Sequence, residues 1–159
     1  QVQQVVRTEG PETHLTKQGT PTMGGTLILS SIFLSVILWG DLENRYLWVA
    51  FLTAMSFGIL GWVDDRLKII HKSSDGLSAR SKILWQSVIA IFACSYLYFS
   101  QQNIAETSLI IPFFKDVSIP LGIGFIFLSY LVVIGTSNAV NLTDGLDGLA
   151  ILPLSLIHI

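Results

Sequence analysis

Long runs of uncharged, mostly apolar residues alternate along the chain with short polar segments. Four of these runs are long enough to contain a membrane span of eighteen residues: 23–40, 46–63, 83–100 and 121–138, the last within a longer uncharged run from 117 to 143. An eighteen-residue helix is about 27 Å long, close to the ~30 Å hydrocarbon thickness of a bilayer. The pattern predicts an all-α integral membrane protein, a polytopic helical bundle with about four complete transmembrane helices. Residues 151–159 are either the start of a fifth helix or a cloning or sequencing scar.

The basic residues divide unevenly between the two sides that these spans define. One side carries seven of them and the other carries two: Arg7, Lys17, Arg66, Lys68, Lys72, Arg80 and Lys82 against Arg45 and Lys115. Because cytoplasmic loops are enriched in Lys and Arg, we expect cytoplasmic segments at 1–22, 64–82 and 139–150 and a periplasmic loop at 101–120. All of the candidate chemistry then faces the cytoplasm.

The predicted periplasmic loop contains two short apolar stretches, 108–114 and 117–119, on either side of Lys115-Asp116. This arrangement is typical of a small β-hairpin. Pro112 and Pro120 lack an N–H to donate and restrict the strands to edge positions.

The composition supports a membrane protein and excludes a general nucleic-acid binder. The chain has 159 residues, of which 51% are hydrophobic and 13% charged, and a mean hydropathy of +0.62. The formal net charge of -2 offers no broad basic surface for nucleic acid. The single cysteine, Cys94, cannot form an internal disulfide. Since the chain opens at Gln1 without an initiator Met and stops within an apolar run, we interpret it as a fragment.

Two adjacent carboxylates, Asp64 and Asp65, follow the second span directly. Charges are expensive inside a bilayer, so we expect both at the membrane surface, outside the protein core. Helical residues four apart stack, which pairs Asp64 with Lys68 and leaves Asp65 free. Carboxylates are hard ligands for Mg²⁺, and lysines attract phosphate, so the pair favours magnesium-dependent phosphate chemistry. An ordinary solvated helix end is the alternative.

Two further stretches carry candidate chemistry. Residues 19–25 contain three glycines and a proline ahead of the first span, and such a loop could hold a phosphate at a helix N-terminus, although many helices simply start after Gly and Pro. Lys17, Lys68 and Lys82 are the candidate phosphate contacts. At the end of the last span, polar residues recur every third position: Asn138, Asn141, Asp144 and Asp147. Their side chains need polar partners, which a ligand or a metal ion could supply. The alternative is an ordinary turn at the membrane interface.

Three stretches together resemble a known enzyme family: residues 10–25 (GPETHLTKQGTPTMGG), 61–68 (GWVDDRLK) and 138–150 (NAVNLTDGLDGLA). They are similar to the polyprenyl-phosphate N-acetylhexosamine-1-phosphate transferases, and the first stretch resembles the bacterial phospho-N-acetylmuramoyl-pentapeptide transferase branch, the MraY translocases. The resemblance implies Asp64 and Asp65 as catalytic and metal-binding residues. It implies substrate-binding roles for Lys17, Thr22, Lys68, Lys82, Asn138, Asn141, Asp144 and Asp147.

The resemblance also implies an activity. Such an enzyme moves phospho-MurNAc-pentapeptide from UDP-MurNAc-pentapeptide to undecaprenyl phosphate with Mg²⁺, giving lipid I and UMP for peptidoglycan synthesis. It is a multi-pass protein of the bacterial inner membrane and a homodimer when full length. Family members are about twice as long and carry a further magnesium-linked aspartate and a histidine-rich loop, so we expect this fragment alone to be inactive. The alternatives are the branch that transfers GlcNAc-1-phosphate and a non-enzymatic transporter fragment.

The sequence suggests how the work is divided between the carboxylates. A phosphate monoester has a second pKa near 6, so the lipid phosphate is mostly dianionic at neutral pH and needs little help from a base. Asp64 is our candidate for activating that phosphate, and Asp65 for metal or electrostatic support. A covalent aspartyl-phosphate intermediate is the alternative route.

Overall fold

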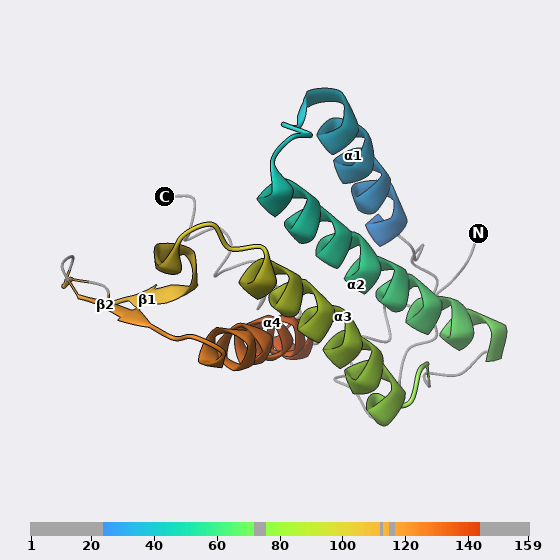
Figure 1. The fold of residues 1–159 in the computed structure, drawn as a ribbon. Coiled ribbons are helices and arrows are strands. Elements are labelled where there is room, and N and C mark those ends of the chain that lie inside the picture. Colours follow the sequence, from blue (N-terminus) through green and yellow to red (C-terminus); the bar gives the residue numbers. More distant parts are fainter. Residues whose placement is uncertain (1–23, 72–75, 112, 115–116, 144–159) are drawn as a thin grey trace. The chain divides into compact units, whose positions relative to one another are not determined.

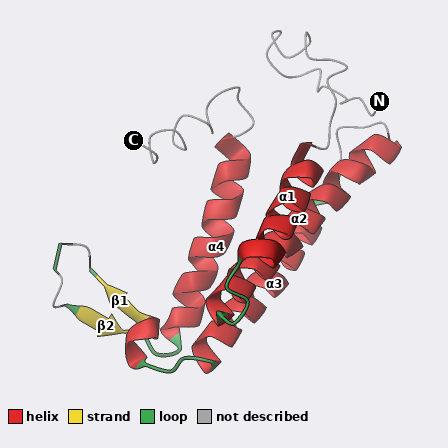
Figure 2. Ribbon diagram, turned by 90° about the horizontal axis from the view of Figure 1, so that it is seen from above, coloured by secondary structure: helices red, strands yellow, loops and turns green. Residues whose placement is uncertain are grey.

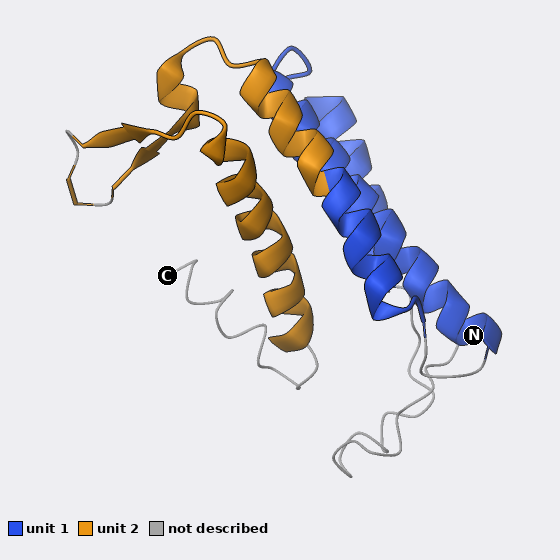
Figure 3. Cartoon of the chain, turned by 60° about the horizontal axis from the view of Figure 1, so that its bottom comes forward, with its two compact units in different colours: residues 1–89 blue, residues 90–159 orange. Residues whose placement is uncertain are grey.

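The computed structural model describes residues 24–71, 76–111, 113–114 and 117–143 (Figure 1). The described elements in chain order are α1 (Gly24–Trp39), α2 (Arg45–His71), α3 (Ala79–Phe99), the 3₁₀ helix η2 (Ile104–Thr107), β1 (Ser108–Ile110), β2 (Ser118–Pro120) and α4 (Gly124–Thr143). The chain divides into two compact units, residues 1–89 and 90–159, with α3 running through the boundary (Figure 3).

Helices dominate the described residues, and three of them are long and apolar enough to cross a membrane: α2, α3 and α4 (Figure 2). The predicted all-α membrane fold is therefore confirmed. Helix α1 is equally apolar but has 16 residues, or about 24 Å, which is shorter than the hydrocarbon layer. Most of the large apolar side chains on these helices are exposed, as they are on lipid-facing helices.

Helix α2 extends well beyond the predicted end of its span. The apolar run ends at Val63, but the helix continues through Asp64 and Asp65 to His71. We expected a loop from residue 64 to residue 82, whereas the structure has two more turns of α2 and an early start of α3 at Ala79. The reason is that hydropathy reports where charges begin, and charges at helical spacing stabilise a helix instead of ending it.

In the first unit, α1 packs against α2 through a glycine (Figure 1). A Cβ placed on Gly58 would lie 2.5 and 2.7 Å from the two methyl carbons of Leu29, so the absence of a side chain there lets Leu29 reach the α2 backbone. Phe33 of α1 adds a ring contact with Phe51 of α2, at 5.9 Å between centroids. Gly61, one turn further along α2, has nothing within 4 Å of its Cβ position and takes no part in this contact.

The turn between these helices is built from local hydrogen bonds. The side chain of Asn44 accepts a hydrogen bond from the N–H of Tyr46 at 2.9 Å and so satisfies a donor of the first α2 turn. The indole N–H of Trp48 reaches back to the carbonyl of Leu42 at 2.7 Å. These bonds set the angle at which α2 leaves the turn.

In the second unit, β1 and β2 form the predicted antiparallel hairpin. The register pairs Ser108 with Pro120 and Leu109 with Ile119. Pro120 is the last residue of β2, a position where its missing N–H removes no central hydrogen bond. The N–H of Leu121 donates to the carbonyl of Thr107 at 3.3 Å, which ties the base of the hairpin to η2 just before α4 begins.

Candidate active site

The last two turns of α2 bring two carboxylates and an ammonium group together. Lys68 Nζ lies 2.7 Å from Asp64 Oδ2 and 3.1 Å from Asp65 Oδ1. Asp64 is buried, with 8% of its surface exposed, whereas the side chain of Asp65 is 56% exposed. Two adjacent residues of the same type thus occupy different environments.

Two expectations about this pair are wrong. We expected Asp65 to have no partner on the helix, but Lys68 contacts both carboxylates, because residues three apart are neighbours on a helix as well as residues four apart. We also expected both carboxylates at the surface, but Asp64 is buried because the chain returns over it at the start of α3.

The segment before α3 closes over Asp64. The backbone N–H of Leu77 donates to Asp64 Oδ1 at 2.7 Å. Gly76 lies so close that a Cβ there would collide with Asp64 Oδ1 and come within 2.9 Å of the Asp64 carbonyl oxygen. Both oxygens of this carboxylate are therefore occupied, one by Lys68 and one by the backbone of the next segment.

Helix α3 then begins with a capped turn that carries a second lysine. The hydroxyl of Ser78 accepts a hydrogen bond from the N–H of Ser81 at 3.2 Å, the usual way to satisfy a donor at a helix N-terminus. Lys82 lies in this first turn and adds its positive charge to the field at Asp64. The predicted phosphate-contact residues Lys68 and Lys82 thus both act on the same carboxylate.

The electrostatics keep the Asp64–Lys68 pair charged. Burial by itself would raise the pKa of Asp64, but hydrogen bonds from Lys68 and Leu77 and the charges of Lys68 and Lys82 outweigh it, so this pKa lies below its ordinary value. Burial would likewise lower the pKa of Lys68, but hydrogen bonds to Asp64 and Asp65 and their charges raise it. At neutral pH, Asp64 is a carboxylate and Lys68 an ammonium ion.

The carboxylates at the end of α2 are the candidate ligands of the predicted magnesium site. Among the described residues there is no group of three or more Asp, Glu, His or Cys side chains that could enclose a metal ion. Mg²⁺ does not need such a group, because it is usually held by one or two carboxylates together with substrate phosphates and water. Of the two carboxylates, Asp65 is the accessible one, and its contact with Lys68 uses one of its two oxygens. The residues present fit a magnesium ion shared with a phosphate ligand.

Sequence reasoning missed Gly76 and Leu77. Nothing in the sequence indicates that the backbone N–H of Leu77 returns to Asp64, thirteen residues earlier in the chain. The one available signal is Ser78, a residue type that commonly caps a helix N-terminus and so indicates a helix start close to Leu77.

The remaining predicted site residues divide into two groups. Asn138 and Asn141 lie near the end of α4, in the second unit, where Asn138 is half-buried and donates to the carbonyl of Ile134 at 2.9 Å, and Asn141 is exposed. Lys17, Thr22, Asp144 and Asp147 lie outside the described residues. We call Asn138, Asn141, Asp144 and Asp147 the Asn-Asp cluster, and that this cluster shares one site with Asp64 and Asp65 stays a prediction.

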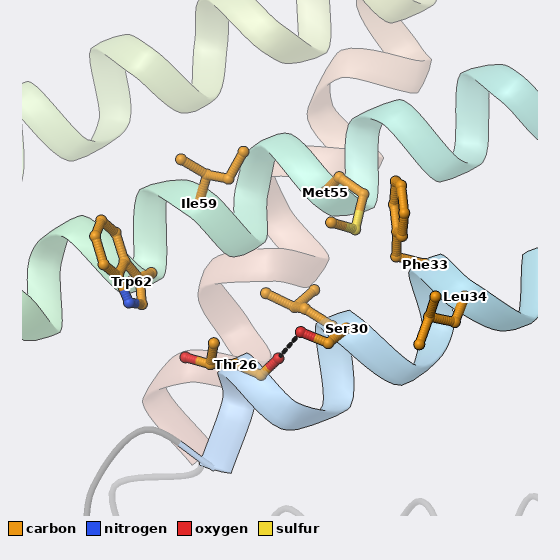
Figure 4. A pocket seen from close by; sticks show the side chains of 8 residues that line it. Thr26, Ser30, Phe33, Leu34, Met55, Ile59 and Trp62 are labelled. Atoms are coloured by element: carbon orange, nitrogen blue, oxygen red, sulfur yellow. Dashed lines mark hydrogen bonds between the residues drawn. The ribbon is translucent and has the colours of Figure 1, made fainter. Parts of the chain in front are cut away.

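An apolar pocket of about 440 Å³ lies between α1 and α2 (Figure 4). Thr26, Ser30 and Phe33 line it from α1, and Met55, Ile59 and Trp62 from α2. The hydroxyl of Ser30 donates to the carbonyl of Thr26 at 2.8 Å, so it is already satisfied within its helix. None of the residues that line this pocket is charged.

Comparison with known protein families gives two matches. The model of glycosyl transferase family 4 matches residues 47–159, which include α3, α4 and all of α2 except its first two residues. A second, shorter match covers residues 17–29, where the chain fits signature 1 of phospho-N-acetylmuramoyl-pentapeptide-transferase. The carboxylate and lysine cluster at the end of α2 lies within the first match, and Lys17 and Thr22 lie within the second.

Proposed function

This chain belongs to glycosyl transferase family 4, and its two matches together indicate a membrane-bound enzyme that transfers a sugar phosphate to polyprenyl phosphate. Within this family, we propose that it acts on a muramoyl-pentapeptide donor. In this proposal the protein moves phospho-MurNAc-pentapeptide from its UDP carrier to undecaprenyl phosphate, forming lipid I and UMP for peptidoglycan at the bacterial inner membrane. The observation that carries the choice of donor is the signature match at residues 17–29.

The arrangement at the end of α2 suits the transfer of a phosphate group at a membrane surface. The polar cluster begins where the apolar run of α2 ends, at the depth where a lipid phosphate lies and a cytoplasmic nucleotide sugar can reach it. The main barrier is the approach of two anions. Lys68 and Lys82 provide fixed positive charge that would stabilise the pyrophosphate as charge moves onto the leaving UMP.

We assign different roles to the two carboxylates. Asp64 is buried, its oxygens accept hydrogen bonds from Lys68 and Leu77, and its pKa is lowered, so it is a poor proton acceptor. Its role in this proposal is to position Lys68 and the start of α3, in place of the activating role that the sequence suggested. The lipid phosphate is mostly dianionic at neutral pH and needs no base to attack.

Asp65 is our candidate ligand for a catalytic magnesium ion. Its side chain is 56% exposed, against 12% for that of Asp64, and the N–H of Leu77 donates to Asp64. When bound, the metal would supply charge neutralisation at the phosphate oxygens of the donor. The residues of this chain would hold that ion with Asp65 and keep Lys68 next to it.

The donor is tested with the intact protein in vesicles that contain undecaprenyl phosphate. We expect UMP release and a lipid-linked product with UDP-MurNAc-pentapeptide and Mg²⁺, and neither with UDP-GlcNAc. Product from UDP-GlcNAc alone would contradict the proposed donor and indicate the GlcNAc-1-phosphate branch. Omitting the lipid acceptor should abolish UMP release, and a stoichiometric burst of UMP without acceptor would instead indicate a covalent aspartyl-phosphate.

The carboxylate roles are tested by Asp64→Asn and Asp65→Asn in the intact protein. Each should lower kcat by about 10²-fold or more, because charge placement around a transferring phosphate dominates its rate. Only Asp65→Asn should also raise the Mg²⁺ concentration needed for half-maximal activity. Only Asp64→Asn should lower the Tm, since it removes a buried partner of Lys68. The opposite pattern would reverse the two assignments.

A further inference from the structure

The hairpin formed by β1 and β2 exposes an unusual amount of apolar surface. Six of its side chains, which we call the hairpin surface, are more than two-fifths exposed: Leu109, Ile110, Phe113, Phe114, Val117 and Ile119. Phe113 is 99% exposed. Between β1 and β2 the sequence has two charged residues, the adjacent and oppositely charged Lys115 and Asp116. Exposed apolar patches of this kind mark surfaces that contact another apolar phase.

The backbone supports the exposed position of Phe113. This residue has a φ of 76°, the only positive value at a described residue other than glycine. A large aromatic residue is disfavoured there, so the turn accepts strain while presenting its ring to the surroundings. A ribbon of two strands also has little stability of its own in water and usually needs an apolar surface to pack on.

The hairpin is tethered to the bilayer at both ends. Only residues 100–103 separate α3 from η2, and only residues 121–123 separate β2 from α4. Both helices are long and apolar enough to cross the membrane, so the hairpin starts at the bilayer surface where α3 ends and α4 begins. Figures 2 and 3 show the hairpin leaving the start of α4 sideways, across the direction of the helix axis. A ribbon that leaves a membrane-crossing helix in this direction runs along the bilayer surface.

We propose that the hairpin surface lies in the interfacial layer of the bilayer, with its apolar side chains inserted among the lipids. The ribbon has unpaired N–H and C=O groups along both edges, and such edges are not tolerated in hydrocarbon. The backbone therefore stays at the level of the lipid headgroups, and the side chains reach inward. The partner is a lipid surface, because the lipid-facing helices α3 and α4 hold the hairpin next to it.

The proposal is tested by site-specific fluorescence of the intact protein in phosphatidylcholine vesicles. Phe113→Cys and Ile119→Cys are labelled with a small environment-sensitive dye, in a background in which Cys94 and any other cysteine are replaced. Asn103→Cys, which is exposed in the segment between α3 and η2, is the matched control. Brominated lipid quenches dyes within the bilayer, and aqueous iodide quenches dyes in water.

We expect brominated lipid to cause the larger loss of fluorescence at positions 113 and 119 and iodide to cause the larger loss at position 103. Greater quenching by iodide at positions 113 and 119 would show a hairpin in water and overturn the proposal. Protection from both quenchers would overturn it as well, because it would mean that protein covers the hairpin surface.

Discussion

Lys68 contacts two carboxylates that differ in burial, Asp64 and Asp65. Its contacts with Asp64 and Asp65 have similar lengths, 2.7 and 3.1 Å, but only Asp64 is also bound by the start of α3. Both residues are aspartates, so the difference between them comes from the start of α3, which covers Asp64. Asp64 joins two segments of the chain, and Asp65 remains accessible to a ligand.

A substitution at Gly76 tests the contact between Asp64 and the segment before α3. Gly76→Ala would place a methyl group against the carboxylate and carbonyl oxygens of Asp64. Overpacking of this kind typically costs about 1–3 kcal/mol, so we expect a lower Tm and a loss of turnover in the intact protein. Gly61→Ala is the matched control, because the Cβ position of Gly61 has nothing within 4 Å. A Gly76→Ala variant with unchanged Tm and turnover would show that the close contact with Asp64 is unimportant.

The pH dependence of stability follows from the same pair. Because the pKa of Asp64 is lowered by folding, the Asp64–Lys68 pair stabilises the protein above the unfolded value of about 3.9, and this stabilisation is lost as pH falls through the lower folded value. The pKa of Lys68 is raised, so its contribution is present below about 10.4 and lost as pH rises through the raised value. Between these limits we expect a flat contribution.

Denaturant unfolding from pH 3 to pH 8 measures this effect in wild type and Asp64→Asn. The destabilising effect of the substitution should be largest near neutral pH and shrink toward pH 3. A difference that changed near pH 6 or 7 would contradict a lowered pKa for Asp64.

At the scale of elements, helices α1 and α2 are each held in place by contacts with a neighbouring segment. Helix α2 passes from an apolar stretch to a charged one without a break, and its second half is held by the start of α3. Helix α1 depends on α2 along one contact, where Leu29 occupies the space that Gly58 leaves open. In a membrane, small residues at helix contacts replace the hydrophobic driving force that acts in water.

The contact between Leu29 and Gly58 gives a prediction at this scale. Gly58→Leu should push α1 away from α2 and lower the free energy of unfolding by about 1–3 kcal/mol. Leu29→Ala in the same chain should restore part of that loss, because it frees the space that the new side chain needs, and a double-mutant cycle measures the coupling. Gly135→Leu on α4 is the control, since nothing lies within 4 Å of its Cβ position. Equal effects at positions 58 and 135 would argue against a specific contact.

At the scale of the whole molecule, the proposed function needs a particular membrane topology. From the excess of basic residues we predict that the end of α2, the start of α3 and the end of α4 lie at the cytoplasmic surface. A nucleotide sugar from the cytoplasm could then reach both the carboxylates and the Asn-Asp cluster. The hairpin would lie at the opposite surface.

Cysteine labelling tests this topology in the intact protein. Arg80→Cys and Leu142→Cys should react with a membrane-impermeant maleimide only in inside-out vesicles, and Asn103→Cys only in right-side-out vesicles. All three positions are exposed, so access depends on the side of the membrane and not on burial. Labelling of positions 80 and 142 from opposite sides would exclude a shared active site for the Asp pair and the Asn-Asp cluster.

The sequence by itself predicted the apolar helices, the place of the hairpin and the family to which the chain belongs. These features depend on local properties: the lengths of apolar runs, two prolines near short apolar stretches, and motifs of a few residues at 17–29 and 61–68. Only the tertiary structure decided which carboxylate is buried. The N–H of Leu77 and the close approach of Gly76 depend on how the chain returns from α2 to α3, and no pattern of side-chain types along the sequence encodes where a backbone N–H will point.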